Sequence, residues 1–288
     1  MFVFFLRIFP LFCCICTLFL GGCGPLAGPE KGLLPFRVYF LNVGQGDACL
    51  LRTPANRFYL YDIGNEPRYL IAFLRSVKVD TLEAVFVSHP DLDHYGSFPT
   101  LLHEFPIKKV YLPPGMSQNP AWLEVLHAID ASHKPTGTLL AGDTLLWDQD
   151  IRVRALWPYS RAVLQGNNLS LVLRVEYASH TVLLTGDVEE EGEIGMLASG
   201  TTLSSDILKV AHHGSRTSSG LPFLSAVAPH WAIISCDSTV YGHPHPETVA
   251  DLNYVVGDSN RILRTDRVGT VGFEIDEYGV RRIETQRL

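Results

Sequence analysis

Two histidines and two aspartates lie within six residues directly after an apolar run, and this stretch constrains the chain more than any other. Residues 84–94 read A-V-F-V-S-H-P-D-L-D-H, which places His89, Asp91, Asp93 and His94 at the end of an expected strand. A solvated charge run would not normally hold two histidines, and a helix N-cap needs only one acid. Side chains at i, i+2 and i+4 of an extended loop point roughly to one side, so His89, Asp91 and Asp93 can reach a common ion while His94 approaches from a second direction. Imidazole combined with carboxylate suits Zn²⁺ or Mn²⁺.

Other polar residues recur at the same kind of place, where an apolar strand ends. Asp62 follows F-Y-L-Y, Asp187 follows V-L-L-T-G, and His212 and His213 follow I-L-K-V-A. Strand ends on one edge of a sheet bring side chains from distant sequence together. Each residue also has a structural interpretation: a turn aspartate before glycine for Asp62, a helix N-cap for Asp187, and a loop with a buried imidazole for the histidine pair.

The hydrophobic periodicity predicts strands mixed with single helices. Helical patterns cover 68–78, 121–131, 188–199 and 247–256, and strand patterns cover 38–43, 48–53, 57–62, 83–88, 108–113, 151–158, 169–177, 180–187, 207–211, 231–236, 261–266 and 270–276. Such a mixture indicates mixed sheets covered by helices. With 288 residues, 47% of them hydrophobic, the chain can bury a large core, and no linker or repeat divides it. The net charge of −7 provides no global basic field, so a polyanionic substrate would need a local basic patch.

The first residues form a different kind of segment. One cation, Arg7, lies within an apolar run that ends in Leu20-Gly21-Gly22-Cys23, the layout of a secretory signal. The small residues before Cys23 resemble a bacterial lipobox, which predicts a lipoprotein signal peptide over 1–22, a tether over 23–35 and a globular domain over 36–288. An uncleaved membrane anchor is the alternative. Either arrangement predicts an extracytoplasmic, membrane-anchored protein. Cys49 and Cys236 lie in strand patterns and are expected to be buried thiols rather than a disulfide.

The opening motif and seven further blocks of the sequence resemble those of a known family. S-H-P-D-L-D-H is similar to the H-x-H-x-D-H signature of the metallo-β-lactamase fold superfamily, with Asp91 where the second histidine usually stands. The other blocks are F-L-N-V-G-Q-G-D-A, Y-D-I-G, N-N-L-S-L-V-L-R-V-E-Y, L-L-T-G-D-V-E, L-K-V-A-H-H-G-S, Y-G-H-P-H-P and R-T-D-R-V-G-T-V. In this order they resemble the C-terminal metallo-β-lactamase-like domain of the ComEC DNA-uptake family, over about residues 36–276. The resemblance implies an α/β (α+β) fold, a four-layer αββα sandwich of two mixed sheets flanked by helices.

The resemblance also implies a metal centre. His89 and Asp91 would hold one metal position and Asp93 and His94 the other, while Asp187 would bridge the two positions or complete the site. His212 would close the site, with His213 left open as the alternative, and Asp62 would support the loop from behind the ligands. The histidine expected before Asp187 is replaced by Asn167-Asn168-Leu169-Ser170. One position is therefore short of nitrogen, which predicts one or two divalent ions, Zn²⁺ or Mn²⁺.

The chemistry implied is hydrolysis by a metal-activated water. Asp93 would aim the water, and His243 would protonate the leaving oxygen, unless it is only a turn residue between prolines. Asn168 or Ser170 could hold a phosphate oxygen. A local positive rim would come from Lys209, Arg216, Arg264 and Arg267.

The resemblance favours a phosphodiesterase or nuclease acting on extracytoplasmic DNA, single- or double-stranded. The same centre could instead serve a cell-wall or head-group phosphodiester, or a lactam, because a fold does not fix a substrate. A non-catalytic metal-binding lipoprotein is the third hypothesis. No protein partner is indicated by the sequence.

Overall fold

The computed structural model describes residues 34–114, 117–148, 150–159 and 166–285, which lie in one compact unit, Leu33–Leu288. The expected signal peptide over 1–22, the acylation site Cys23 and the tether up to residue 33 lie outside the described residues. Across the described ranges, the helices are too short or too polar to cross a lipid bilayer. Cys49 and Cys236 are both free, buried thiols.

The described residues form two mixed sheets. The order of the larger, eight-stranded sheet is β15-β14-β1-β2-β3-β4-β5-β6, and that of the seven-stranded sheet is β13-β12-β11-β10-β9-β8-β7. The larger sheet contains β1 (Phe36–Phe40), β2 (Ala48–Arg52), β3 (Phe58–Ile63), β4 (Leu82–Phe86), β5 (Val110–Tyr111), β6 (Thr136–Gly137), β14 (Val271–Asp276) and β15 (Gly279–Ile283). The smaller sheet contains β7 (Thr144–Trp147), β8 (Ile151–Trp157), β9 (Val172–Tyr177), β10 (His180–Leu184), β11 (Ile207–Lys209), β12 (Trp231–Ile234) and β13 (Ile262–Arg264).

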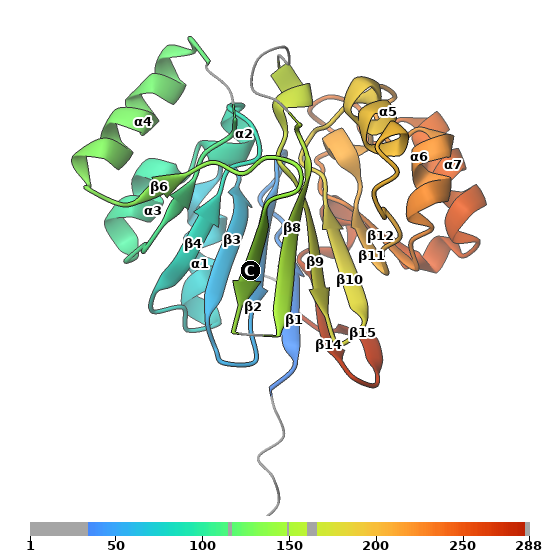
Figure 1. The fold of residues 1–288 in the computed structure, drawn as a ribbon, viewed down its shortest axis with the longest axis horizontal. Helices are drawn as coiled ribbons and strands as arrows, with labels where there is room; N and C mark the ends of the chain where they lie inside the picture. The colour runs from blue at the N-terminus through green and yellow to red at the C-terminus, as the bar shows by residue number, and fades with distance from the viewer. Residues whose placement is uncertain (1–33, 115–116, 149, 160–165, 286–288) are drawn as a thin grey trace, which may run out of the picture. The chain divides into compact units, whose positions relative to one another are not determined.

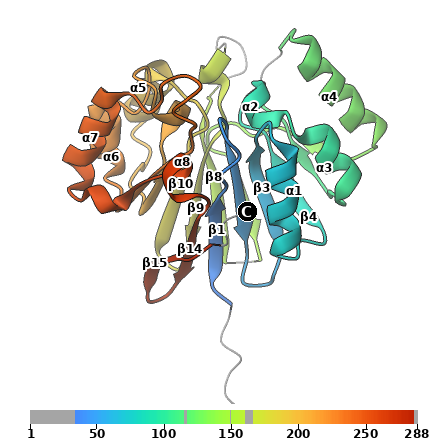
Figure 2. The ribbon, with the colours of Figure 1, turned by 180° about the vertical axis from the view of Figure 1, so that it is seen from behind.

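Helices cover the outer face of each sheet, which gives the four-layer αββα sandwich predicted from the sequence (Figures 1 and 2). The α-helices are α1 (Pro67–Ser76), α2 (Leu92–Tyr95), α3 (Phe98–Glu104), α4 (Pro120–Ala131), α5 (Glu190–Ala198), α6 (Leu221–Val227), α7 (Pro246–Val256) and α8 (Thr265–Val268). Short 3-10 turns are η1 (Gly166–Leu169), η2 (Ala211–Gly214) and η3 (Ser259–Arg261). In the figures, α1, α3 and α4 lie beside the larger sheet, and α5, α6 and α7 lie beside the smaller one.

Three apolar clusters hold the layers together. The central cluster packs the facing sides of the two sheets and includes Phe40, Phe86 and Val153. One outer cluster joins helices α1, α3 and α4 to the larger sheet, and the other joins α5, α6 and α7 to the smaller one. Strand β8 shows how the sequence selects the face: Ile151 and Val153 are buried, while Arg152 and Arg154 between them are exposed, because successive strand side chains point to opposite sides.

The strand directions place the site. Strands β3 and β4 pair in parallel in the larger sheet, and β10 and β11 pair in parallel in the smaller one. Parallel neighbours end at the same edge of a sheet, which is where α/β proteins bind ligands. Asp62 lies at the end of β3, and His89, Asp187 and His213 follow the ends of β4, β10 and β11 respectively. The face-to-face packing of the sheets brings the four loops together.

Candidate metal centre

Asp62 and Ser88 fix the orientation of two buried histidines. The Asp62 carboxylate accepts hydrogen bonds from the Ser88 main-chain N–H at 2.7 Å and the Ser88 hydroxyl at 2.7 Å, and its Oδ2 lies 2.9 Å from His94 Nδ1. The Ser88 hydroxyl oxygen lies 3.0 Å from His89 Nδ1. A carboxylate only accepts, and the Ser88 proton is committed to Asp62, so both Nδ1 atoms must donate. In their neutral forms, His89 and His94 therefore carry the lone pair on Nε2.

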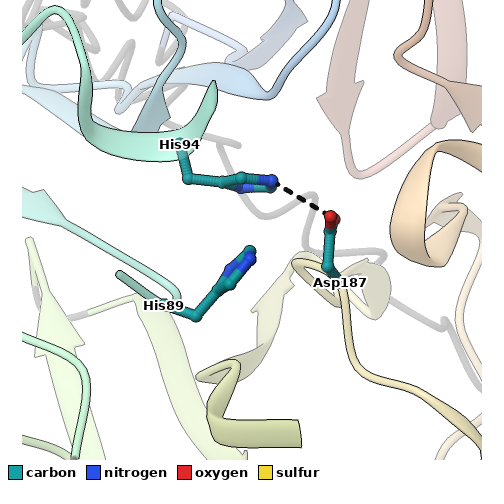
Figure 3. A group of neighbouring side chains, drawn as sticks. All are labelled: His89, His94 and Asp187. Carbon is teal, nitrogen blue, oxygen red and sulfur yellow. Dashed lines mark ion pairs between the residues drawn. The ribbon is translucent and has the colours of Figure 1, made fainter. Parts of the chain in front are cut away.

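The Nε2 atoms of these histidines face Asp187. His94 Nε2 lies 3.2 Å from Asp187 Oδ2, and Figure 3 shows His89, His94 and Asp187 converging from three segments. Ligand atoms of the three residues all lie within 4.8 Å of one another. Asp91 is more peripheral, because its Oδ2 is 3.6 Å from His89 Nε2 and its side chain is 52% exposed. The structure thus brings His89, His94 and Asp187 together and leaves Asp91 at their margin.

The structure places His213, rather than His212, in the centre of the cluster. His213 Nε2 lies 3.2 Å from Asp93 Oδ2 and 3.2 Å from Asp187 Oδ2, while its Nδ1 lies 2.8 Å from the carbonyl oxygen of Ser235, to which it donates. In its neutral form, His213 therefore also carries the lone pair on Nε2. Asp93, His94 and His213 form a second group that could hold an ion.

His212 lies at the side of the cluster. The backbone of both histidines is left-handed, with φ of 50° at His212 and 55° at His213. His212 Nδ1 lies 3.3 Å from Glu189 Oε1 and 3.2 Å from Thr217 Oγ1, and its Nε2 is 4.0 Å from Asp187. The geometry therefore places His213, the alternative left open by the sequence, among the candidate ligands and His212 beside them.

Sequence reasoning missed Asp47, which lies in the buried centre of the site. Its carboxylate pairs with the Lys209 ammonium, and its Oδ1 lies 3.5 Å from His213 Nδ1. The signal was the G-Q-G-D loop between two strands: a Cβ on Gly46 would collide with the main-chain oxygen of Asp93, so glycine lets this loop approach the ligand loop. The Asp47 N–H also donates to the Asp93 carbonyl oxygen at 3.1 Å.

The electrostatics of the cluster fit a cation. Although burial opposes it, the Asp187 and Asp62 carboxylates raise the pKa of His94 well above its usual range. Burial likewise opposes the effect of Asp187 and Asp47, which raise the pKa of His213 to about 9. Burial would raise the pKa of Asp187, yet His213 and His94 hold it well below its usual range. Positive charge therefore stabilises the buried carboxylates. Without an ion, protons on the imidazole rings provide this charge, and a bound divalent ion would replace those protons.

Buried polar atoms that make no hydrogen bond also indicate a metal ion. Within the part of the chain that the structure describes, Nε2 of His89, His94 and His213 and Oδ1 of Asp187 are buried and make no hydrogen bond. Buried polar atoms normally have a partner. Three imidazole nitrogens with carboxylate oxygens are a donor set for Zn²⁺ or Mn²⁺. The residues present therefore fit a divalent metal ion.

A pocket of about 180 Å³ opens onto the cluster. His243 lies in it with its ring centroid 5.7 Å from that of His212. Burial, followed by the neighbouring charges of His212 and His213, lowers the pKa of His243. The ring of Tyr241, 69% exposed, lies beside it. The lining consists of Gln45, Asp91, Asp93, Asp187, His212, His213, Tyr241 and His243.

Two of the residues expected to bind substrate instead support the site. The Ser170 hydroxyl accepts from the Asp187 main-chain N–H at 3.0 Å. The Asn168 side-chain oxygen accepts from the main-chain N–H groups of Glu189 at 3.1 Å and Gly192 at 3.2 Å, at the start of helix α5. Both side chains therefore hold the segment that carries Asp187.

The expected positive rim is not at the pocket. Lys209 is buried, with 2% exposure. Arg264 pairs with Asp266 at 2.6 Å, and Arg267 lines a separate cavity beside helix α1. Arg216 is exposed on the loop after η2. Over the described ranges, the lining of the site pocket includes no lysine or arginine.

An αββα sandwich with this cluster at the shared edge of its sheets defines the class of a metal-dependent hydrolase. Residues 41–238 match the family model of the Metallo-beta-lactamase superfamily, and the chain belongs to that superfamily.

The chain is also similar to part of larger proteins. It is 32% identical over 256 residues to ComE operon protein 3 of Bacillus subtilis (strain 168), covering 82% of this chain and 32% of that protein. It is 32% identical over 245 residues to Competence protein ComA of Neisseria gonorrhoeae, covering 83% of this chain and 32% of that protein. The chain thus spans about a third of the length of these relatives.

One solved structure illustrates the shared fold. The metallo-beta-lactamase fold protein YhfI from Bacillus subtilis aligns with a TM-score of 0.51 at 13% identity, covering 79% of this chain and 95% of that one. At this identity the likeness shows the fold alone.

Proposed function

We propose that the protein is a metal-dependent phosphodiesterase that cleaves DNA outside the cytoplasm. The observation that carries the proposal is a set of three buried imidazoles beside an open pocket. Their Nε2 atoms make no hydrogen bond among the described residues and lie close to Asp187. The names of the relatives support DNA as the substrate, because ComE operon protein 3, Competence protein ComA and Recombination protein 2 of Haemophilus influenzae refer to competence and recombination.

His89, His94 and Asp187 would hold the ion, with Asp93 and His213 adjoining. A divalent ion bound there lowers the pKa of a water and polarises a phosphoryl oxygen. Asp93 is 29% exposed, with Oδ2 3.2 Å from His213 Nε2 and Oδ1 4.0 Å from His94 Nε2. We infer that Asp93 Oδ1 accepts a hydrogen bond from the attacking water. His243 lines the same pocket with a buried Nδ1 that has no partner among the described residues, which supports a position beside the leaving oxygen.

The test uses the purified full chain, loaded with Mn²⁺ or Zn²⁺, on single- and double-stranded DNA and on methyl p-nitrophenyl phosphate. Metal-dependent cleavage of DNA is expected, and Asp93→Asn should remove most of it. Asp130→Asn is the matched control, because Asp130 is exposed on helix α4. DNA cleavage that survives in Asp93→Asn would indicate a contaminating nuclease.

A smaller phosphodiester is the second candidate substrate. It is favoured by the pocket lining, which carries no lysine or arginine within the described chain, and by the net charge of −7. Nucleic-acid affinity depends strongly on phosphate neutralisation by such cations. Cleavage of the small phosphodiester without cleavage of DNA would select this alternative.

The proposed location rests on Leu20-Gly21-Gly22-Cys23. Removal of 1–22 and acylation of Cys23 would hold the domain at a membrane. Cys23→Ala should then release the protein from the membrane fraction or stall its processing. Unchanged mass and attachment in the variant would favour the uncleaved anchor.

A further inference from the structure

A buried lysine lies among the candidate metal ligands. Lys209 is the last residue of strand β11 and is 2% exposed. Its ammonium group contacts Asp47 Oδ2, donates to the main-chain oxygen of Gly186 at 3.2 Å and lies 3.7 Å from Asp187 Oδ1. An ammonium group is rarely buried unless it is paired, so these oxygens define a cation position in the interior.

This cation position coincides with one of the candidate metal groups. Asp47, Asp187 and His213 bring ligand atoms within 4.8 Å of one another and could hold an ion by themselves. Lys209 already contacts Asp47 and faces Asp187, two of these three residues. A divalent ion in the same group would share both carboxylates with the ammonium group, and the like charges would repel at short range.

The group formed by His89, His94 and Asp187 is different. The salt bridges of Lys209 in the described structure are to Asp47 and Asp187, and its contact in this group is limited to Asp187 Oδ1. Asp187 Oδ2 faces His94 and His213. One carboxylate can therefore face the lysine with one oxygen and an ion with the other.

We propose that Lys209 is a built-in cation that takes the place of a second metal ion, so that the centre binds a single divalent ion beside His89, His94 and Asp187. The inference rests on the metal site of the proposed function and not on its substrate. It assigns Lys209 a role in fixing the number of ions and the position of Asp187, without contact with substrate.

The experiment measures metal stoichiometry in the full chain. Wild type and Lys209→Met are loaded with Mn²⁺ or Zn²⁺, freed of excess by dialysis, and analysed by elemental analysis and native mass spectrometry. Wild type should retain one equivalent, and Lys209→Met should retain two, because removal of the ammonium leaves Asp47 and Asp187 free for a second ion. Lys108→Met, a matched change at an exposed lysine paired with Glu83, should retain one.

Two equivalents in wild type would overturn the inference, as would one equivalent in folded Lys209→Met. If circular dichroism shows that Lys209→Met is unfolded, Lys209→Gln replaces it and is expected to retain two equivalents of metal. If neither variant folds, the metal stoichiometry of the wild type alone tests the inference. A wild type that binds no metal would overturn the proposed centre itself. A wild type that binds one ion but cleaves no DNA would overturn only the proposed substrate.

Discussion

Replacement of Asp62 by asparagine should weaken metal binding without touching a ligand. Asp62 is fully buried, and its two oxygens meet the Ser88 main-chain N–H, the Ser88 hydroxyl and His94 Nδ1. Its φ is 54°, a left-handed conformation that asparagine tolerates better than most residues, so Asp62→Asn should preserve the backbone. The perturbation is then confined to hydrogen bonding.

An amide offers one accepting oxygen where the carboxylate offers two. If that oxygen keeps the Ser88 N–H, the amide NH₂ faces the Ser88 hydroxyl and His94 Nδ1, which both donate in the wild type. His94 must then move its proton to Nε2, or a buried donor is left unsatisfied at a cost of about 1–3 kcal/mol. At about 1.4 kcal/mol per tenfold change, this corresponds to roughly 5- to 150-fold weaker metal binding. That range spans the factor of about 10–100 typical of residues that orient metal ligands.

The assay is competition with chelators of graded affinity, read by the electron paramagnetic resonance signal of free Mn²⁺. Asp130→Asn, at an exposed position of helix α4, is the control for the chemical change and should bind metal as wild type does. Metal affinity of Asp62→Asn within twofold of wild type would refute the reasoning, because it would mean that Asp62 does not set the tautomers.

Three further perturbations test the surroundings of the site. Tyr241→Ala should weaken single-stranded DNA binding about tenfold, since stacking of a base on one ring contributes about 1–3 kcal/mol. Tyr254→Ala is the control, because this ring on helix α7 is 78% exposed, and it should leave the affinity unchanged. Equal affinities of the two variants in fluorescence anisotropy titrations would contradict this prediction. His243→Ala should keep its metal and lose about 10²–10⁴-fold in rate, with rescue by a phosphodiester that has a good leaving group; loss of metal on elemental analysis would count against this role. Burial raises the pKa of Glu193 from 4.5 to about 7, so ionisation of this carboxyl group disfavours the folded state. The free energy of unfolding should therefore be highest below pH 4.5 and fall as the pH rises through 7. The loss is on the order of 3 kcal/mol, at about 1.4 kcal/mol per pKa unit. Chemical denaturation should show a flatter pH slope for Glu193→Gln, and an unchanged slope would contradict the assignment.

The strands and helices could be predicted because the hydrophobic periodicities were strong, and the four-layer arrangement was expected from the family resemblance. The helix expected over 121–131 is α4, Pro120–Ala131, and that expected over 247–256 is α7, Pro246–Val256. The location of the site also followed from sequence, because each strand that carries a ligand ends in a polar residue after an apolar run. His89, Asp93, His94 and Asp187 lie in the cluster for that reason.

The finer assignments required the fold. Adjacent histidines have identical chemistry, and only the folded position of their loop shows that His213 lies closer to Asp187 than His212 does. Lys209 ends an apolar strand and looked like a surface cation, but its partner Asp47 is distant in the sequence. Asn168 appeared free to bind phosphate, and its role in capping helix α5 depends on the tertiary position of that helix.

Metal content in two neighbouring variants tests the central claim most directly. Full-length His213→Ala and His212→Ala are loaded with Mn²⁺ or Zn²⁺, dialysed together and compared with wild type by elemental analysis. Because His213 Nε2 lies 3.2 Å from Asp187 Oδ2 and so adjoins the ion position, whereas His212 pairs with Glu189, we expect His213→Ala to retain less metal than wild type and His212→Ala to retain the same amount. Retention by His213→Ala with loss by His212→Ala would contradict the centre described here.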